Sequence, residues 1–183
     1  MAGDSPSEAL ANYVRPLQRA VACVHPNAQF ATDCHNPRDG KVHNLILAGN
    51  EPIRVAAVSG RPSFLVFIHQ AFIIVQEQDK ARGPWRASTR GYTYAVMEDN
   101  DTQREIVAYH WHPGEQGFGE PHLHIPDHPN TYMEHAHIPS GRVSMEAFVG
   151  FLIREFKVKA HLSGYRGILE LSETQFRRFR TWG

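Results

Sequence analysis

The chain has 183 residues, 42% of them hydrophobic, which is enough for one domain with a hydrophobic core and too few to favour two domains. Lys+Arg 19 and Asp+Glu 19 give a formal net charge of zero, so no global field favours a nucleic-acid or membrane partner. Because the chain has two cysteines, no signal-peptide pattern at its start and no apolar run long enough to cross a bilayer, we expect a soluble, cytoplasmic protein.

The first predicted element is a helix over about residues 6–24. Ser5 fits the N-cap, Pro6 the first helical position and Glu8 the acidic position of a capping box. Apolar residues then recur at helical spacing along one face: Leu10, Tyr13, Val14, Leu17, Val21 and Val24. Pro16 lies within this run and lacks a backbone N–H, so it should kink or interrupt the helix.

The middle of the chain is predicted to form strands. Two short β-rich segments, residues 42–48 and 53–58, are separated by the turn-prone GNEP. Residues 63–78 also fit a helix face, but their β-branched and aromatic content favours a strand. The clearest β pattern is the pair GYTYAVMED and QREIVAYHWHP, which flank the polar DND and predict a hairpin.

Two helices are predicted near the C-terminus. The segment SMEAFVGFLIREF has Ser144 at its N-cap and Glu146 in its first turn, where the helix dipole favours an anion. Its apolar residues share one helical face: Met145, Phe148, Val149, Leu152, Ile153 and Phe156. Ser172 and Gln175 form a capping-box pattern that predicts a last short helix in LSETQFRRFRTW.

These elements predict an α+β fold, as a single domain over residues 1–183. An antiparallel β-sheet is expected over about residues 42–125. The N-terminal helix and the C-terminal helices, at about residues 144–181, are expected to pack on that sheet.

Histidines are concentrated in one segment. Of the 12 histidines, seven lie between residues 109 and 139. Six of them form three His-x-His pairs: His110 with His112, His122 with His124, and His135 with His137. Residues i and i+2 of a strand face the same side, so the first pair should share a face with Ile106 and Ala108. We expect the first two pairs to share one surface-accessible pocket.

Three interpretations of these histidines stay open. In the first, they bind a divalent metal (Zn, Mn or Fe), with nearby carboxylates completing the site: Glu115, Glu120, Asp127 and Glu134. In the second, two imidazoles act as base and acid on an RNA phosphodiester without a metal. In the third, they are hydrogen-bonded side chains of a polar sheet face. The spacing permits metal and metal-free chemistry equally.

The segment EHAHIPSGRVS leads directly into the amphipathic helix. Free N–H groups at a helix N-terminus suit a phosphate or a carboxylate, and an arginine adds a two-pronged contact. We therefore place Arg142 at the anion side of the pocket, with His135 or His137 as the next ligand or proton carrier. The alternative is a solvated arginine beside a structural turn.

Three segments occur in the order GYTYAVMEDNDTQREIVAYHWHP, PHLHI and AHIPSGRVSMEAFVGFLIREF, within residues 71–157. This order resembles the TumE-type toxins of bacterial toxin–antitoxin pairs. The resemblance implies a small α+β toxin with ribonuclease activity against its host, an antitoxin partner, and a match of His122 and His124 to the family's Pro-His segment. The chain departs from the family in its strand end, AYHWHP, and in its N-terminal helix.

The sequence therefore predicts a hydrolase or transesterase, a toxin-like nuclease that cleaves RNA phosphodiesters. The residues expected at its site are His110, His112, His122, His124, His137 and Arg142. The alternatives are a metal-dependent enzyme acting on a small molecule, with the first four histidines as ligands, and a non-catalytic module with a structural zinc.

Overall fold

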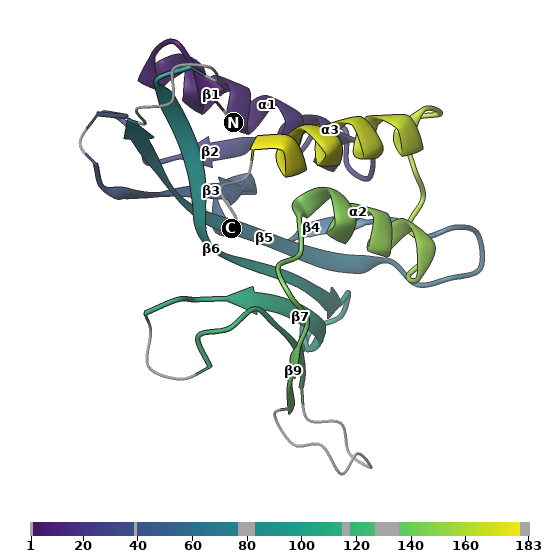
Figure 1. Ribbon diagram of the computed structural model, residues 1–183. Coiled ribbons are helices and arrows are strands. Elements are labelled where there is room, and N and C mark those ends of the chain that lie inside the picture. The colour runs from purple at the N-terminus through teal and green to yellow at the C-terminus, as the bar shows by residue number, and fades with distance from the viewer. Residues whose placement is uncertain (1, 39, 77–82, 115–117, 127–135, 180–183) are drawn as a thin grey trace.

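One antiparallel sheet with three helices on one of its faces makes up the fold (Figure 1). The computed structural model describes residues 2–38, 40–76, 83–114, 118–126 and 136–179. The α+β class expected from the sequence is confirmed. No helix of these described segments is long and apolar enough to cross a bilayer.

The sheet runs in the order β2-β3-β5-β6-β7-β8-β9, with β1 added to β6 and β4 added to β5. In chain order the strands are β1 (Ala2–Gly3), β2 (Phe30–Thr32), β3 (Val42–Leu47), β4 (Ile53–Val55), β5 (Phe64–Gln76), β6 (Trp85–Glu98), β7 (Glu105–Trp111), β8 (His122–Ile125) and β9 (Ala136–Pro139). A 3-10 helix, η1 (Ala48–Asn50), links β3 to β4. The two longest strands, β5 and β6, therefore pair at the centre of the sheet.

Strand β5 confirms the β interpretation of this part of the chain. Ile68 and Phe72 are fully buried, whereas His69 and Ala71 are only partly buried. Burial with a period of two belongs to a strand that has one covered face, because successive side chains point to opposite sides. The covered face of β5 packs against the helices, and the other face, which carries His69, points away from them.

Helix α1 (Pro6–Ala22) begins at the predicted N-cap. Ser5 Oγ accepts a hydrogen bond from Glu8 N at 3.1 Å, a contact that typically contributes about 1 kcal/mol. The helix continues through Pro16, so the expected interruption does not occur. The buried stripe of α1 packs on the sheet on both sides of the proline, and tertiary packing provides most of the stability of a protein helix.

Helix α2 (Met145–Arg154) is capped as predicted, since Ser144 Oγ accepts a hydrogen bond from Ala147 N at 3.1 Å. Its buried face packs against the sheet. Phe148 has no exposed surface, and its ring stacks on that of Tyr94 with the centroids 5.2 Å apart. Replacing such a buried phenylalanine by alanine typically costs about 3–5 kcal/mol. This contact therefore holds the first turn of α2 against β6.

Helix α3 (Tyr165–Phe179) differs from the prediction. It begins well before LSETQ, so Ser172 lies inside the helix and the predicted capping box with Gln175 is wrong. The Ser172 hydroxyl is buried and donates a hydrogen bond to Glu146 Oε1 at 2.5 Å. Ser172 is therefore an interior contact between α2 and α3 and not an N-cap.

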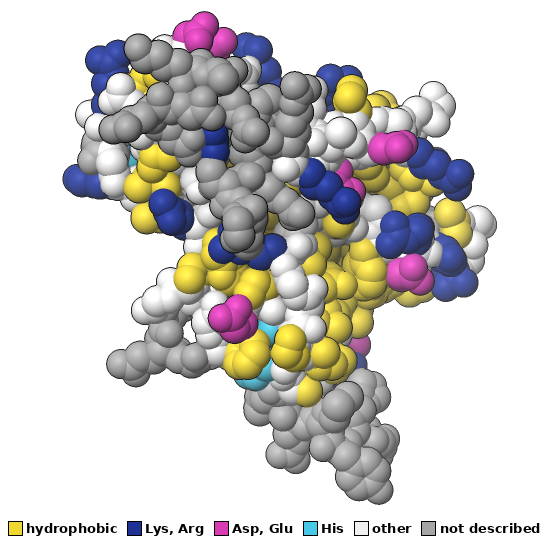
Figure 2. Space-filling model, viewed as in Figure 1, with side chains coloured by type: hydrophobic (Ala, Val, Ile, Leu, Met, Phe, Trp, Pro, Cys, Tyr) yellow, Lys and Arg dark blue, Asp and Glu magenta, His cyan; other side chains and the backbone are white. Residues whose placement is uncertain are grey.

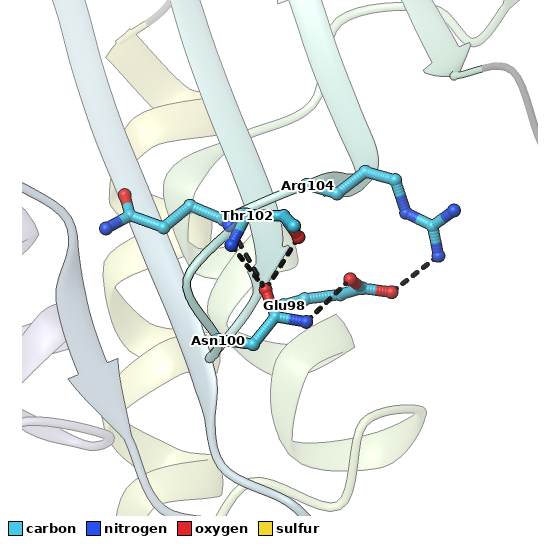
Figure 3. Close-up of polar contacts among 5 residues, drawn as sticks. Glu98, Asn100, Thr102 and Arg104 are labelled. Carbon is cyan, nitrogen blue, oxygen red and sulfur yellow. Dashed lines mark hydrogen bonds and ion pairs between the residues drawn. The ribbon is translucent and has the colours of Figure 1, made fainter.

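The hairpin between β6 and β7 is held by a compact polar turn (Figure 3). Asn100 Oδ1 accepts hydrogen bonds from Thr102 N and Thr102 Oγ1, at 3.1 and 2.8 Å, and from Gln103 N at 3.1 Å. Glu98 accepts from Asn100 Nδ2 at 3.0 Å and from Arg104 Nη2 at 2.6 Å. These contacts fix the residue at which β7 begins, and therefore its register on β6.

The carboxylate of Glu146 is buried beneath the helices. The residue is 2% exposed, and its Oε2 atom has no hydrogen-bond partner within the described residues. Burial raises the pKa of this carboxyl group above its ordinary value of 4.5, and the hydrogen bond from Ser172 partly opposes that rise. The folded protein thus holds this proton to a higher pH than the unfolded chain does.

We therefore expect Glu146 to lower the free energy of unfolding as the pH rises from 4.5 through its raised pKa, and to keep it lowered above that value. Glu146→Gln should remove this loss and stabilise the protein at pH 7 by about 1 kcal/mol, with little effect at pH 4. Urea denaturation at several pH values measures the free energy of unfolding of the wild type and of the variant. The exposed Glu155→Gln is the control, and an unchanged pH profile in Glu146→Gln would contradict the assignment.

Candidate functional site

The pairing of β7, β8 and β9 brings the histidine pairs onto one face of the sheet. His110 lies opposite His122, and His124 lies opposite His137. Directly opposed residues of an antiparallel pair project to the same side. His112 follows His110 by two residues, so its side chain also points to this face. The two upstream pairs therefore share one face of the sheet, as the strand alternation predicts, and the single surface-accessible pocket expected of them stays a prediction.

The five rings form one continuous group, which we call the histidine cluster: His110, His112, His122, His124 and His137. The His110 ring centroid lies 5.5 Å from those of His112 and His122 and 5.6 Å from that of His124. His137 closes the group, with its centroid 4.8 Å from His122 and 5.4 Å from His124. Imidazole atoms reach the surface between apolar side chains (Figure 2).

Phe118 covers part of the histidine cluster. Its ring is stacked on His137 at 5.7 Å and meets His122 edge-on at 5.0 Å. His122 is only 3% exposed, while Phe118 itself is 42% exposed. The cluster therefore has a buried imidazole below an aromatic ring that still presents a large apolar surface to solvent. The segment between the first two pairs gives no sequence signal that Phe118 would lie there.

Ala108 is a small residue on the face of β7 that carries the imidazoles. It lies directly opposite His124 and two residues before His110, so it is on the histidine face. It is nevertheless 0% exposed. The rings of His110 and His124 are nearly parallel, with an angle of 16° between their planes. A small side chain is thus what allows both rings to lie over β7.

A β-bulge brings a carboxylate to the cluster. The register of β6 and β7 shifts between Val96 and Met97, so that Met97 pairs with Glu105 and Ile106 has no opposite residue. Glu105 then shares the face of the histidines, while Ile106 packs against the core. The expectation that Ile106 lies on the histidine face is therefore wrong, because simple alternation stops at the bulge.

Glu105 and a backbone carbonyl fix the orientation of two imidazoles. His124 Nδ1 lies 2.7 Å from Glu105 Oε1, and His122 Nδ1 lies 2.7 Å from the carbonyl oxygen of Glu120. An ionised carboxylate and a carbonyl can only accept, so Nδ1 is the donor in both rings. In the neutral form of each ring the lone pair is then on Nε2, the atom that acts as base or ligand.

His110 differs electrostatically from its neighbours. The pKa of His110 is lowered from 6.5 to about 4, chiefly by desolvation on burial and in smaller part by the adjacent imidazoles of His112, His122, His124 and His137. At neutral pH His110 is therefore an uncharged imidazole. Such a ring can accept a proton from a reacting hydroxyl group, as a general base does.

Polar contacts extend from the cluster across the open face. Thr93 Oγ1 lies 3.2 Å from His112 Nε2. On β5, His69 Nε2 lies 2.9 Å from Asn44 Oδ1 on β3. His69 is not among the residues expected from the sequence, because a single histidine in an apolar strand gives no signal until the pairing register is known.

Arg142 lies outside the histidine cluster. Its guanidinium carbon is 3.4 Å from the centroid of the Trp111 ring, and Trp111 alternates with His110 and His112 on β7. The structure thus brings Arg142 to the helix side of β7, beside a cavity of about 440 Å³ that Trp111 and Pro121 also line. The cluster lies on the other side of the strand.

Within the described segments, no three His, Cys, Asp or Glu side chains are grouped as a metal-ligand set. Several predicted contributors fall outside the described residues: Glu115, Asp127, Glu134 and His135. Comparison with protein-family models, with curated proteins and with solved structures finds no match to this chain. Any functional inference therefore depends on the chemistry of the described side chains.

The low pKa of His110 makes a prediction about acid stability. An unfolded histidine takes up a proton near pH 6.5, whereas His110 in the folded protein does so only near pH 4. Its contribution is therefore complete above pH 6.5 and is lost as the pH falls toward 4. We expect His110→Asn to lose less stability than the wild type between these values, in urea denaturation at each pH. The exposed His161→Asn should keep the wild-type profile; the same profile in His110→Asn would refute the assignment.

Proposed function

We propose that the protein is a nuclease that cleaves RNA phosphodiesters by metal-independent transesterification at the histidine cluster. One observation carries the proposal: two adjacent imidazoles, those of His110 and His124, have different electrostatic environments. His110 is desolvated and neutral, whereas His124 is hydrogen-bonded to the carboxylate of Glu105. Titratable groups in unequal environments are the usual arrangement for a base and an acid that act in one reaction.

In the proposed reaction, His110 accepts the proton of the ribose 2′-hydroxyl as its oxygen attacks phosphorus. The bond from phosphorus to the 5′-oxygen breaks, and protonated His124 donates its proton to that oxygen. The products are a 2′,3′-cyclic phosphate and a 5′-hydroxyl. The Glu105 carboxylate, 2.7 Å from Nδ1, holds the His124 ring in place and offsets its positive charge.

The remaining residues of the predicted site take secondary roles. His122 and His137 pack against the two reacting imidazoles and position them, and Phe118 offers a stacking surface for a base. Arg142 is on the helix side of β7, so we propose that it contacts a more distant phosphate of the strand. The TumE-type resemblance supports cytoplasmic RNA of the host as the substrate and an antitoxin as the partner.

Substitution of the two imidazoles tests the mechanism. His110→Ala and His124→Ala should each lower kcat for a model oligoribonucleotide by about 10²- to 10⁴-fold. Glu105→Gln removes the charge beside His124 and should lower kcat by at least about tenfold. His161→Ala is the matched control, and melting temperatures verify folding. Unchanged kcat in both cluster variants would refute the proposal.

A metal-dependent enzyme acting on a small molecule is the second candidate. The donation from Nδ1 of His122 and His124 to a carbonyl and a carboxylate is also the pattern around metal-bound histidines. A structural zinc held by the same residues would give the same pattern.

Metal analysis separates these candidates from the nuclease. We expect cleavage to continue at the wild-type rate in EDTA, because the proposed acid and base need no metal. Elemental analysis of the same preparation is the companion measurement. Stoichiometric zinc, manganese or iron, together with loss of activity in EDTA, would favour the metal-dependent enzyme; metal without any activity would favour the structural site.

A further inference from the structure

A line of polar side chains crosses the open face of the sheet at right angles to the strands. His69 on β5 lies opposite Thr93 on β6, Thr93 lies opposite His110 on β7, and His110 lies opposite His122 on β8. His69 is therefore two strands away from His110, a separation of roughly 10 Å at the usual strand spacing. At this distance His69 lies near His110, the proposed general base, but outside the histidine cluster.

The hydrogen bonds behind His69 fix which of its nitrogens faces a ligand. Asn44 Nδ2 donates to Asp33 Oδ2 at 2.7 Å, so the amide oxygen of Asn44 is the atom beside His69. That oxygen lies 2.9 Å from His69 Nε2, which must then carry the hydrogen. Nδ1 is left as an acceptor.

Burial, and then the neighbouring His112, lower the pKa of His69, so the ring is neutral at pH 7. The Asp33 carboxylate behind Asn44 would repel a phosphate. A neutral acceptor with a carboxylate behind it therefore suits an N–H donor and not an anion.

An aromatic ring lies next to His69 on the same face. Phe67 precedes His69 by two residues on β5 and is only partly buried. The residues opposite Phe67 and Ala71 on β6 are small, Ala95 and Gly91. Phe67 thus offers a ring edge or face to a planar ligand without a bulky neighbour on β6. The Thr93 hydroxyl connects this area to His112 of the cluster.

We propose that Phe67 and His69 form a nucleobase subsite, which binds a base of single-stranded RNA close to the cleaved bond. The Phe67 ring stacks on the base, and His69 Nδ1 accepts a hydrogen bond from a base N–H group. The identity of the ligand rests on the proposed nuclease function, whereas the subsite is defined by the hydrogen bonds of His69 and by the strand register that places Phe67 beside it.

Binding of a non-cleavable strand tests the subsite without catalysis. A fluorescent oligoribonucleotide with 2′-O-methyl groups lacks the attacking hydroxyl and can be titrated by fluorescence anisotropy. Phe67→Leu removes the stacking on one base, which should weaken Kd by about tenfold. His69→Ala removes the hydrogen bond to the base and should weaken Kd by about the same factor. Phe67→Leu keeps an apolar side chain, and melting temperatures verify that both variants fold.

Ile73→Ala is the matched control, because Ile73 lies on the same face of β5 and four residues from His69. Its Kd should stay within about twofold of the wild type. Equal Kd values for the wild type and both subsite variants would overturn the inference, and so would a wild type that does not bind the strand. Cleavage of the unmodified strand is measured separately: weakened binding in the variants of a protein that cleaves nothing would support the subsite and refute the nuclease.

Discussion

The pairing of β6 with β7 is the interaction on which the candidate site depends. The turn around Asn100 fixes where β7 begins, and the bulge at Ile106 changes which residues face each side. Before the bulge the carboxylate of Glu105 points to the open face, and after it His110 and His112 point the same way. Without the extra residue, Glu105 would lie on the helix side, far from His124. One irregularity in the ladder therefore joins an acid to the imidazoles.

The division of the sheet into a covered and an open face explains why the histidines can gather. All the large aromatic contacts between strands and helices, such as Tyr94 with Phe148, are on the covered side and supply the core. The open side does not need to be apolar, so it can hold a row of groups that are poor at core packing. Burial within the histidine cluster then lowers the pKa of His110. This lowered pKa arises from the whole cluster and not from the residues next to His110 in the sequence.

The sequence predicted what depends on local pattern. The N-caps at Ser5 and Ser144, the strand character of the segment around His69 and the convergence of two histidine pairs all follow from spacing within short segments. It failed where distant residues decide. Ser172 lies inside α3 and bonds to Glu146 of α2, the position of Glu105 depends on a bulge, and the place of His69 depends on which strands pair. Arg142 was expected beside the histidines because it shortly precedes the N-terminus of α2, and that local pattern does not say on which side of β7 the residue lies.

Ala108 has a consequence for how the site tolerates change. Its methyl group has no chemical role, yet it has no exposed surface and shares a face of β7 with His110, opposite His124, the two residues that the proposed reaction uses. Any larger side chain there would lift one ring or turn both, and a buried site can accommodate extra volume only by moving its neighbours. The positions of the two imidazoles thus depend on a residue that has no reactive group of its own. A larger residue at this position would displace the rings of the proposed reaction while leaving every histidine in place.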